Sequence, residues 1–460
     1  MSMRVISEKD YWMLRLACAF ACLLSVFVLQ SSVCLAQPHA WTLPECCDYA
    51  IAHSISIRQQ ENQCRQQEIN LSNAVNSRLP DLSGSMSQNF SFGRGLTADN
   101  TYSNTNTSST NFSLGTSVPL FTGFQIPNQI KMSKLNLEAA TADLEKAKND
   151  IRMQVAQAYA QILYDMEIAD VAHRQIAIDS QQVVRLAALV DNGKASGAQL
   201  SQQKATLANS RLTATQADNN LSVALLSLSQ LLELPSASGF TVVRPAVGES
   251  GGSLAAAAIP SPDAVYAEAL GIKPEIAAQQ LRLRATDNNI AIARSGYMPT
   301  LSFSGGIGSN YYTTSKFPSD GFGTQLKNNF SQYIGLNLNV PIFNRFQTRN
   351  NIRSAKIEQQ NQQLTLDNTK KTLYKEIQQV CLNATAARAK YESSAAAAQS
   401  SNDAFVLMQA KYENGKANIT EFNESKNACL RAESDLVQAR YELLYQHSLI
   451  NFYRGRPLEF

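Results

Sequence analysis

The sequence predicts a mixed α/β membrane protein, built by internal tandem duplication, in which alternating strands give way to long coiled-coil helices. Three observations favour this class. The segment VPLFTGFQ at 118–125 recurs as VPIFNRFQ at 340–347, 222 positions later. Apolar and polar residues alternate with period two before each copy, as in strands with one apolar face. After each copy, apolar residues recur with heptad spacing over about 70 residues, as in coiled-coil helices.

The N-terminal region has the pattern of a secretory signal peptide. Basic residues precede an apolar run at 16–29, and a small-x-small pattern ends at Ala36. We therefore expect residues 1–36 to be removed and the mature chain to begin at Gln37. A lipid anchor on Cys34 is the alternative, although the preceding valine fits it poorly.

The duplication divides the mature chain into two equivalent repeats. The offset of 222 positions extends to an Asn-Gly-Lys sequence shared by the two repeats, at 192–194 and 414–416. Upstream, Pro80 corresponds to Pro299 with an offset of 219. Each repeat is expected to hold a short helix, a β-hairpin, a long helix and a return helix. The first repeat, a linker and the second repeat are placed at 37–234, 235–260 and 261–460.

Each repeat carries two segments with period-two alternation. The four segments lie at 81–92, 111–120, 301–307 and 334–340. Polar loops at 93–110 and 308–330 separate the members of each pair, so each repeat should form one hairpin. Lipid cannot satisfy a free strand edge, and four strands are too few to close on themselves. If the strands cross a membrane, several chains must therefore share one β-barrel.

Heptad-spaced residues such as Leu137, Leu144 and Ile151 predict a long helix in each repeat. About 70 residues at 1.5 Å each give a helix of about 105 Å, several times the ~30 Å hydrocarbon core of a bilayer. The helices must therefore project into an aqueous space. Return helices are expected at about 198–233 and 420–452, which makes the intervening turns the distant tips.

Glycine favours the left-handed conformation that ends many helices, so the Asn-Gly-Lys sequences are expected at the tips. The tip residues are Asn192, Gly193, Lys194, Asn414, Gly415 and Lys416. The repeated Val-Pro-x-Phe is expected where strand changes to helix, because proline lacks the N–H that a strand ladder needs. These junction residues are Pro119, Phe121, Pro341 and Phe343.

Several segments in this order resemble the TolC family of outer-membrane efflux proteins. TLPECCDYAIAHS resembles the family's first short helix, RLPDLS and YMPTLS its strand starts, VPLF and VPIF its strand ends, and SLINFYRG its C-terminal end. The resemblance covers almost the whole mature chain. It implies a homotrimer with a 12-stranded barrel in the outer membrane, four strands per chain, continuous with a periplasmic α-helical barrel. Residues 235–260 would belong to the equatorial region of that barrel.

The same resemblance implies a passive exit duct of a tripartite efflux pump or a type I secretion system. Its partners would be a periplasmic adaptor protein and an inner-membrane transporter, besides outer-membrane lipid. The cargo is left open, and drugs, metals, peptides and proteins all fit a wide wet tunnel. A periplasmic coiled-coil scaffold without a pore is the main alternative.

The resemblance also places Glu421, Glu424 and Tyr412 at the narrow periplasmic entrance. The two glutamates are three residues apart and share one helix face. Gln199 stands in the first repeat where the family commonly has an acid, so a Tyr412–Gln199 hydrogen bond would replace a charged contact. Stabilisation of a helix N-terminus by carboxylates is the alternative role for the glutamates.

Charge and motif content speak against other classes. A net charge of +3 with 17% charged residues gives no nucleic-acid footprint. The sequence contains neither a phosphate-binding loop nor the paired Cys spacing of a zinc site, so no cofactor or metal is expected. The segment GESGG at 248–252 satisfies G-x-S-x-G, which keeps a secreted hydrolase using Ser250 as a third hypothesis. Its low-complexity surroundings do not suit a nucleophile elbow, so we expect no enzyme.

Overall fold

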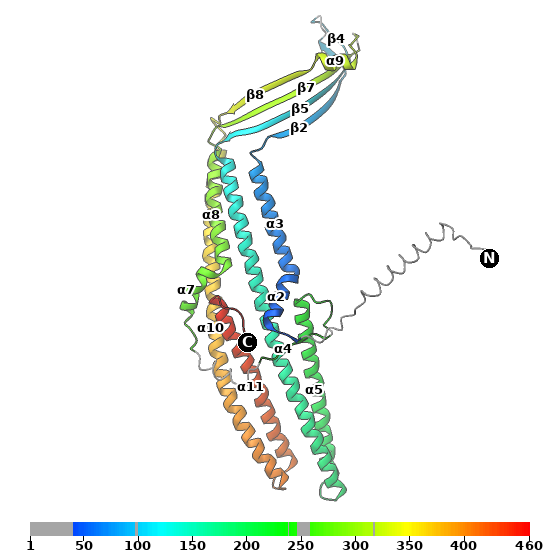
Figure 1. The fold of residues 1–460 in the computed structure, drawn as a ribbon, viewed down its shortest axis with the longest axis vertical. Coiled ribbons are helices and arrows are strands. Elements are labelled where there is room, and N and C mark those ends of the chain that lie inside the picture. The colour runs from blue at the N-terminus through cyan, green and yellow to red at the C-terminus, as the bar shows by residue number, and fades with distance from the viewer. Residues whose placement is uncertain (1–39, 97–99, 238, 246–257, 316–317) are drawn as a thin grey trace, which may run out of the picture.

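The computed structural model describes residues 40–96, 100–237, 239–245, 258–315 and 318–460. The chain is long and narrow, with an antiparallel sheet at one end and helices that run away from it (Figure 1). The C-terminus lies part-way along the helical region. Among the described residues, none of the helices combines the length and the apolar character needed to cross a bilayer. The expected signal peptide and residues 248–252 lie outside the described ranges.

Four strands form the sheet in the order β2-β5-β7-β8, and all neighbours are antiparallel. The strands are β2 (Asp81–Ser91), β5 (Thr107–Thr122), β7 (Thr300–Thr314) and β8 (Ser331–Asn339). Each repeat contributes one hairpin, as predicted. The pairing of β5 with β7 joins the two repeats, and β2 and β8 form the edges of the sheet.

The connections within the β-hairpins contain more strand and helix than the sequence indicated. β5 already begins at Thr107 and β7 continues to Thr314, so the predicted loops at 93–110 and 308–330 were too long. They also contain a small strand pair, β3 (Arg94–Leu96) with β4 (Tyr102–Asn104), and the helix α9 (Phe322–Asn328). The strand extensions consist largely of Ser, Thr, Asn and Tyr, so no apolar alternation marks them.

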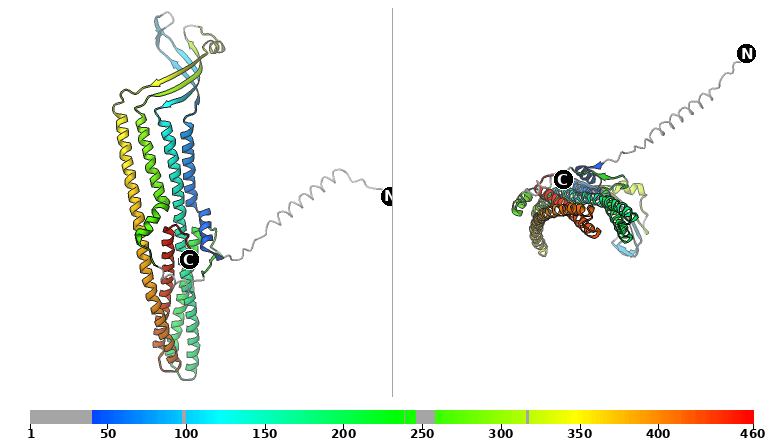
Figure 2. Two further views of the ribbon diagram at one scale, coloured as in Figure 1. Left: turned by 60° about the vertical axis from the view of Figure 1, so that its left-hand side comes forward. Right: turned by 90° about the horizontal axis from the view of Figure 1, so that it is seen from below.

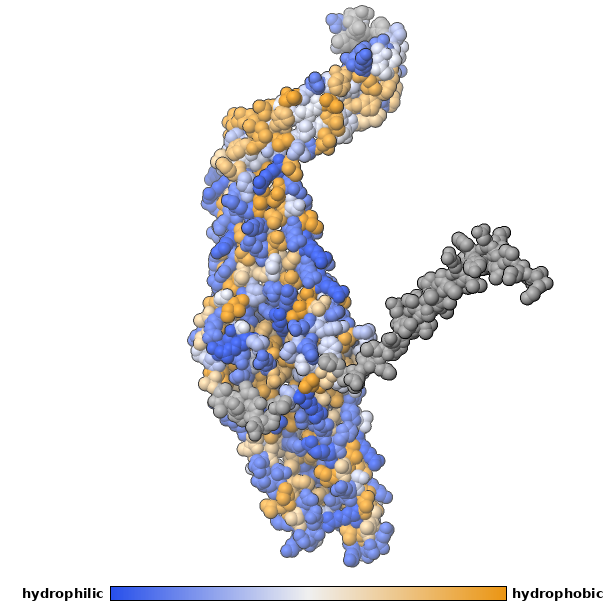
Figure 3. Space-filling view, viewed as in Figure 1, coloured by the Kyte–Doolittle hydropathy of each residue, from blue (hydrophilic) through white to orange (hydrophobic). Residues whose placement is uncertain are grey.

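The register of the sheet separates its two faces by polarity. Residues directly opposite one another, such as Leu114 and Ile307, share a face. One face carries the apolar side chains of all four strands, namely Leu82, Met86, Phe90, Phe112, Leu114, Val118, Leu301, Phe303, Ile307, Ile334, Leu336 and Leu338. The other face carries mainly Ser, Asn and Gly. Apolar residues accordingly cover much of the sheet surface in Figure 3.

Two helical hairpins extend from the sheet and have matching bounds. α4 (Gln125–Asp191) and α10 (Gln347–Glu413) have 67 residues each, and α5 (Gly197–Leu231) and α11 (Ile419–Tyr453) have 35 each. Every boundary in the second hairpin lies 222 positions after its counterpart. The predicted long helices, return helices and turns are thus confirmed. α4 packs along α5, and α10 packs along α11.

Two shorter helices precede the β-hairpin of each repeat. They are α2 (Leu43–His53) and α3 (Ile55–Asn76) in the first repeat, and α7 (Pro262–Ile272) and α8 (Pro274–Ser295) in the second. α3 packs along α4 as α8 packs along α10. α8 also packs along α4, so it lies between the two repeats, side by side with both long helices (Figure 2).

The main core lies in the middle of the helical region. Heptad residues of both long helices, including Ile151, Val155 and Leu373, pack there with α2, α7 and the ends of α5 and α11. A two-residue strand β1 (Ala40–Trp41) pairs in parallel with β6 (Thr241–Val242) of the linker, which the sequence did not indicate. The Tyr159 hydroxyl donates to one carbonyl oxygen from each segment of this strand pair, to Trp41 O at 3.2 Å and to Val243 O, directly after β6, at 2.6 Å.

Candidate functional site

The sheet exposes a large apolar surface. Ile334 is 82% exposed and Leu82 is 73% exposed, although both have large hydrocarbon side chains. On the opposite face the hydroxyls of Ser85 and Ser113 are hydrogen-bonded at 2.7 Å, and Asn111 Nδ2 donates to Ser87 Oγ at 3.3 Å. One face therefore suits an apolar environment and the other suits water.

The repeated motif forms a turn from strand to helix with two successive left-handed residues. Gly123 and Phe124 have φ of 61° and 66°, and Arg345 and Phe346 have φ of 54° and 61°. In each turn the two phenylalanines pack edge to face, Phe121 with Phe124 at 5.3 Å between ring centres and the second pair at 5.5 Å. This aromatic pair explains why Phe-x-x-Phe recurs in both repeats.

The two prolines of the motif do not occupy equivalent places. Pro341 follows the end of β8 at Asn339, as expected. Pro119 lies inside β5 opposite Ser302, so the prediction that it ends the strand was wrong. The register shifts between Pro119 and Phe121, and such an irregularity accommodates a residue that cannot donate to the ladder.

Gly123 lies in close contact with the segment of the second repeat where α8 ends and β7 begins. A Cβ atom at this position would be 2.6 Å from the Cβ of Met298 and 2.9 Å from the carbonyl oxygen of Ser295. Ser295 is the last residue of α8, and Met298 lies in the turn between α8 and β7. The strand-to-helix junction of the first repeat is thus packed directly on the helix-to-strand junction of the second.

The tips have the expected conformation. Gly193 and Gly415 have φ of 70° and 71°, and no heavy atom lies within 4 Å of a Cβ built on either glycine. The backbone N–H of Lys194 donates to Leu189 O at 2.8 Å, which closes a Schellman-type helix end. The second tip repeats this bond at the same distance. Each tip is therefore a hydrogen-bonded turn with open space around its glycine.

The return helices begin with capping boxes that use two of the predicted entrance residues. The Glu421 carboxylate accepts from the backbone N–H of Asn418 at 3.1 Å, and the Glu421 N–H donates to Asn418 Oδ1 at 2.9 Å. Gln199 makes the same two bonds with Ser196. Glu424, one turn further along α11, is exposed. A capping role is therefore established for Glu421 and Gln199, and the entrance role stays a prediction.

Tyr412 packs against Phe422 of its own hairpin and against Arg185 of the other hairpin. Its ring stacks on Phe422 at 4.8 Å between centres, and the Arg185 guanidinium lies 5.3 Å from the ring centre. Burial raises the pKa of the Tyr412 phenol. Within the part of the chain that the structure describes, no hydrogen bond joins Tyr412 to Gln199, whose amide oxygen is taken by its helix cap. The predicted Tyr412–Gln199 bond is thus not formed within one chain.

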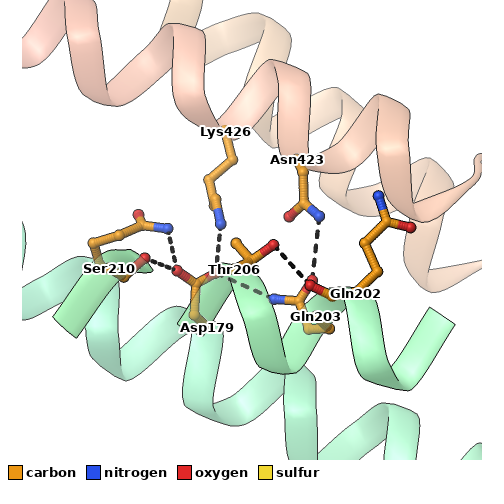
Figure 4. A network of polar contacts seen from close by, with 8 residues as sticks. Asp179, Gln202, Gln203, Thr206, Ser210, Asn423 and Lys426 are labelled. Atoms are coloured by element: carbon orange, nitrogen blue, oxygen red, sulfur yellow. Dashed lines mark hydrogen bonds and ion pairs between the residues drawn. The ribbon is translucent and has the colours of Figure 1, made fainter. Parts of the chain in front are cut away.

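A buried charge pair, which the sequence analysis missed, joins the two hairpins above the tips. Lys426 of α11 forms an ion pair with Asp179 of α4, and their side chains are 1% and 0% exposed. Figure 4 shows Lys426 reaching across to the carboxylate, which also accepts from Gln203 and Ser210. The sequence did contain a signal for a buried charge. Lys426 follows Ile419 by seven positions, so the heptad spacing places this lysine on the same buried side of α11.

Comparison with known proteins identifies the family. The family model described as "Outer membrane efflux protein" matches residues 47–233 and again 265–450. The chain belongs to this family. It is an outer-membrane efflux channel of the TolC family, as the resemblance predicted. The family consists of channels, so the expectation that the chain is not an enzyme is confirmed, and the scaffold without a pore is excluded.

Relatives of this efflux channel match it over much of its length. The outer membrane efflux protein BepC of Brucella suis biovar 1 is 24% identical over 440 residues, which cover 93% of this chain and 88% of BepC. Protein CyaE of Bordetella pertussis is 28% identical over 322 residues, 66% of this chain and 62% of CyaE.

Solved structures of outer membrane proteins share the fold. The outer membrane protein VceC of Vibrio cholerae is 18% identical with a TM-score of 0.71, over 91% of this chain and 97% of VceC. The CmeC outer membrane channel of Campylobacter jejuni is 18% identical with a TM-score of 0.70, over 91% and 87%.

Proposed function

We propose that three copies of this efflux channel assemble into one continuous duct, which serves as the passive exit of a tripartite efflux pump or a type I secretion system. The sheet carries this proposal. It has one face for lipid and one for water, yet among the residues that the structure describes neither edge strand, β2 or β8, has a pairing partner on its outer side. A sheet in a membrane needs its edges satisfied, so neighbouring copies should supply the missing pairing.

The duplication supplies the expected register of that pairing. Within the chain, the second strand of the first hairpin pairs with the first strand of the second, so that Gly115 lies opposite Gly306. In the duplication β8 corresponds to β5, with the offset of 222 positions, and β2 corresponds to β7, with the offset of 219. The pairing that corresponds to β5 with β7 is therefore that of β8 with β2 of the next copy. It places Asn337 opposite Ser87 of that copy, both on the polar face.

The helices support the same arrangement. α8 packs along α4 of the other repeat, whereas the corresponding contact of α3 would be with α10 of a neighbouring copy. Apolar side chains are exposed on both helices, Ile55 and Ile69 on α3 and Ile357 and Leu364 on α10. Seen from below, the helices of one chain form an open arc rather than a closed ring (Figure 2). Further copies would complete the ring.

Three copies give 12 strands, enough for a water-filled channel rather than an interior filled by side chains. The apolar face of the sheet would then contact lipid and the polar face would line the lumen. The tips would dock a periplasmic adaptor, because they are open, hydrogen-bonded turns at the end furthest from the sheet. Glu421 and Glu424 would form an acidic ring at the entrance, and residues 1–36 would direct export.

Native mass spectrometry in detergent, followed by planar-bilayer recording, tests the proposal. We expect a species of three chains that needs detergent to stay in solution and that forms large, long-lived pores. A monomer that is soluble without detergent and conducts no ions would contradict it.

A further inference from the structure

A cavity of about 500 Å³ lies where the two repeats of one chain meet, part-way along the helical region. Its wall is formed by α2 and α4 of the first repeat, and by the α7–α8 boundary and residues 452–459 of the second. Seen from below, the C-terminus beside this wall lies on the convex side of the arc of helices (Figure 2). The cavity is therefore outside the lumen of the proposed duct, and one chain supplies the residues that line it.

Lys273, between α7 and α8, is a buried cation in the wall of this cavity. Its side chain belongs to a residue that is only 6% exposed, and its Nζ lies 4.1 Å from the ring centre of Phe452 and 4.4 Å from that of Tyr453. The rings favour the positive charge, but an ammonium group has three N–H donors. Among the residues that the structure describes, none accepts a hydrogen bond from it. A buried cation of this kind needs an acceptor, which the cavity has room to hold.

The acidic side chains near Lys273 do not supply that acceptor. Burial lowers the pKa of Lys273, and the charges of Glu275, Glu376 and Asp150 partly oppose this shift. Asp150 pairs with a lysine of its own helix at 2.5 Å, and Glu376 accepts from the Tyr453 hydroxyl at 3.4 Å. These carboxylates offset part of the charge from a distance, and the donors of the ammonium group remain available to a ligand.

Two arginines line the same cavity. Arg152 Nη1 donates to Asn149 Oδ1 at 2.8 Å, which orients its guanidinium group, and Arg456 is exposed. The acidic residues of the wall, Asp48 and Glu459, are also exposed, and in the described part of the chain neither forms an ion pair with these arginines. Apolar side chains form most of the remaining wall, namely Pro44, Cys47, Ile272, Phe452, Pro457 and Leu458. An apolar cavity of this size with a few converging polar groups is typical of small-molecule sites.

The duplication indicates that the fold does not require these cations. With the offset of 219 positions, Lys273 corresponds to Ser54, which is buried between α2 and α3 in the same way. With the offset of 222, the two arginines correspond to Tyr374 and Leu234. The same turn between two helices thus forms with a neutral serine, so a role of the lysine beyond folding is favoured.

We propose that this cavity binds a small organic carboxylate. The carboxylate group accepts hydrogen bonds from Lys273 and from the guanidinium groups of Arg152 and Arg456, whose planar donors match its geometry. The apolar part of the ligand packs on Phe452 and Leu458. Because the cavity lies outside the proposed lumen, this ligand binds to the wall of the channel and is distinct from the exported cargo.

Ligand-observed NMR titration of the purified channel in detergent tests this inference. Benzoate is the probe, and benzamide, which has the same ring and no charge, is its matched control. We expect saturable binding of benzoate and binding of benzamide that is about tenfold weaker or undetectable, because an amide cannot pair with the cations. Absence of saturable benzoate binding, or equal affinity for the two probes, would overturn the inference.

Three variants locate the site. Lys273→Met keeps the length of the side chain without its charge and should weaken benzoate binding about tenfold or more. Arg456→Gln changes an exposed residue, so it tests the site even where Lys273→Met fails to fold, and we expect binding about three- to tenfold weaker. Arg431→Gln, at an exposed arginine of α11 outside the cavity, should bind benzoate like the wild type. Wild-type affinity in Arg456→Gln, or in folded Lys273→Met, would contradict the inference.

The detergent micelle takes up benzoate equally in all variants, so differences among them report the protein site. The titration requires only folded chains, and its failure would leave the proposed duct untouched. Failure to form conducting trimers would instead contradict the proposed function, so the two failures are distinguishable.

Discussion

Replacing Gly123 by alanine should destabilise the protein more than the same change at a tip. Gly123 has φ of 61°, and a residue with a Cβ in the left-handed region costs about 1–2 kcal/mol. The new Cβ would also lie 2.6 Å from the Met298 Cβ and 2.9 Å from the Ser295 carbonyl oxygen. Neither atom can rotate away, because both are fixed to the backbone, so overpacking adds about 1–3 kcal/mol. The expected loss is therefore about 2–5 kcal/mol.

Gly193→Ala is the matched control. Gly193 has φ of 70°, but a Cβ there would meet no atom within 4 Å. Its expected loss is therefore only about 1–2 kcal/mol. Urea unfolding of both purified variants, followed by far-UV circular dichroism, gives the two free energies of unfolding. Equal losses would refute the reasoning, because the close packing of the two repeats at Gly123 would then contribute nothing.

Three further predictions concern the tips, the entrance and the pH dependence. Replacing Gly193 and Gly415 together by valine should abolish adaptor pull-down while leaving the trimer intact, since β-branched residues resist left-handed turns; retained pull-down would show that the tips are not the docking surface. Changing Glu421 and Glu424 to Gln should remove cation preference at low salt and block by multivalent cations in planar bilayers. Thermal stability should be unchanged, because Gln199 shows that glutamine serves the same helix cap; unchanged selectivity would leave Glu421 with the capping role alone. Burial raises the pKa of Glu376 above its ordinary value of 4.5, so the stability gained from its bound proton is present below pH 4.5 and is lost as the pH rises through the raised pKa. Glu376→Gln should therefore melt at a higher temperature than the wild type near neutral pH, with the difference shrinking toward pH 4.5; a difference independent of pH would contradict this.

The helices and hairpins could be predicted because their residue patterns are local and occur twice. Heptads fix the long helices, and Gly193 and Gly415 mark their ends. The alternation of Leu82, Met86 and Phe90 marks a strand, but the Ser- and Thr-rich start of β5 carries no such mark. Two-residue strands such as β1 and β6 have no periodicity at all.

The missed features depend on contacts between distant segments. Phe124 and Phe346 adopt positive φ, which no propensity of phenylalanine predicts; their aromatic partners and the packed junctions hold them there. Asp179 and Lys426 lie in different repeats, 247 positions apart, so neither sequence neighbourhood identifies the partner. At the predicted entrance, the sequence located the helix start correctly and offered stabilisation of the helix N-terminus as the alternative role of Glu421. The geometry adds the two hydrogen bonds of the capping box through which Glu421 does this.

The central claim is that the free edges β2 and β8 pair between copies to close one duct. Cysteines at positions 87 and 337 test it directly, because directly opposite residues in an antiparallel pair have Cβ atoms about 4.5–5.5 Å apart, close enough for a disulfide or a short thiol reagent. The two changes in one chain should give cross-linked species of two and three chains in denaturing gels without reductant, and no larger ones. Either change alone should give only the background of the wild-type cysteines. Exclusively single chains after oxidation, or a ladder that continues beyond three, would contradict the account.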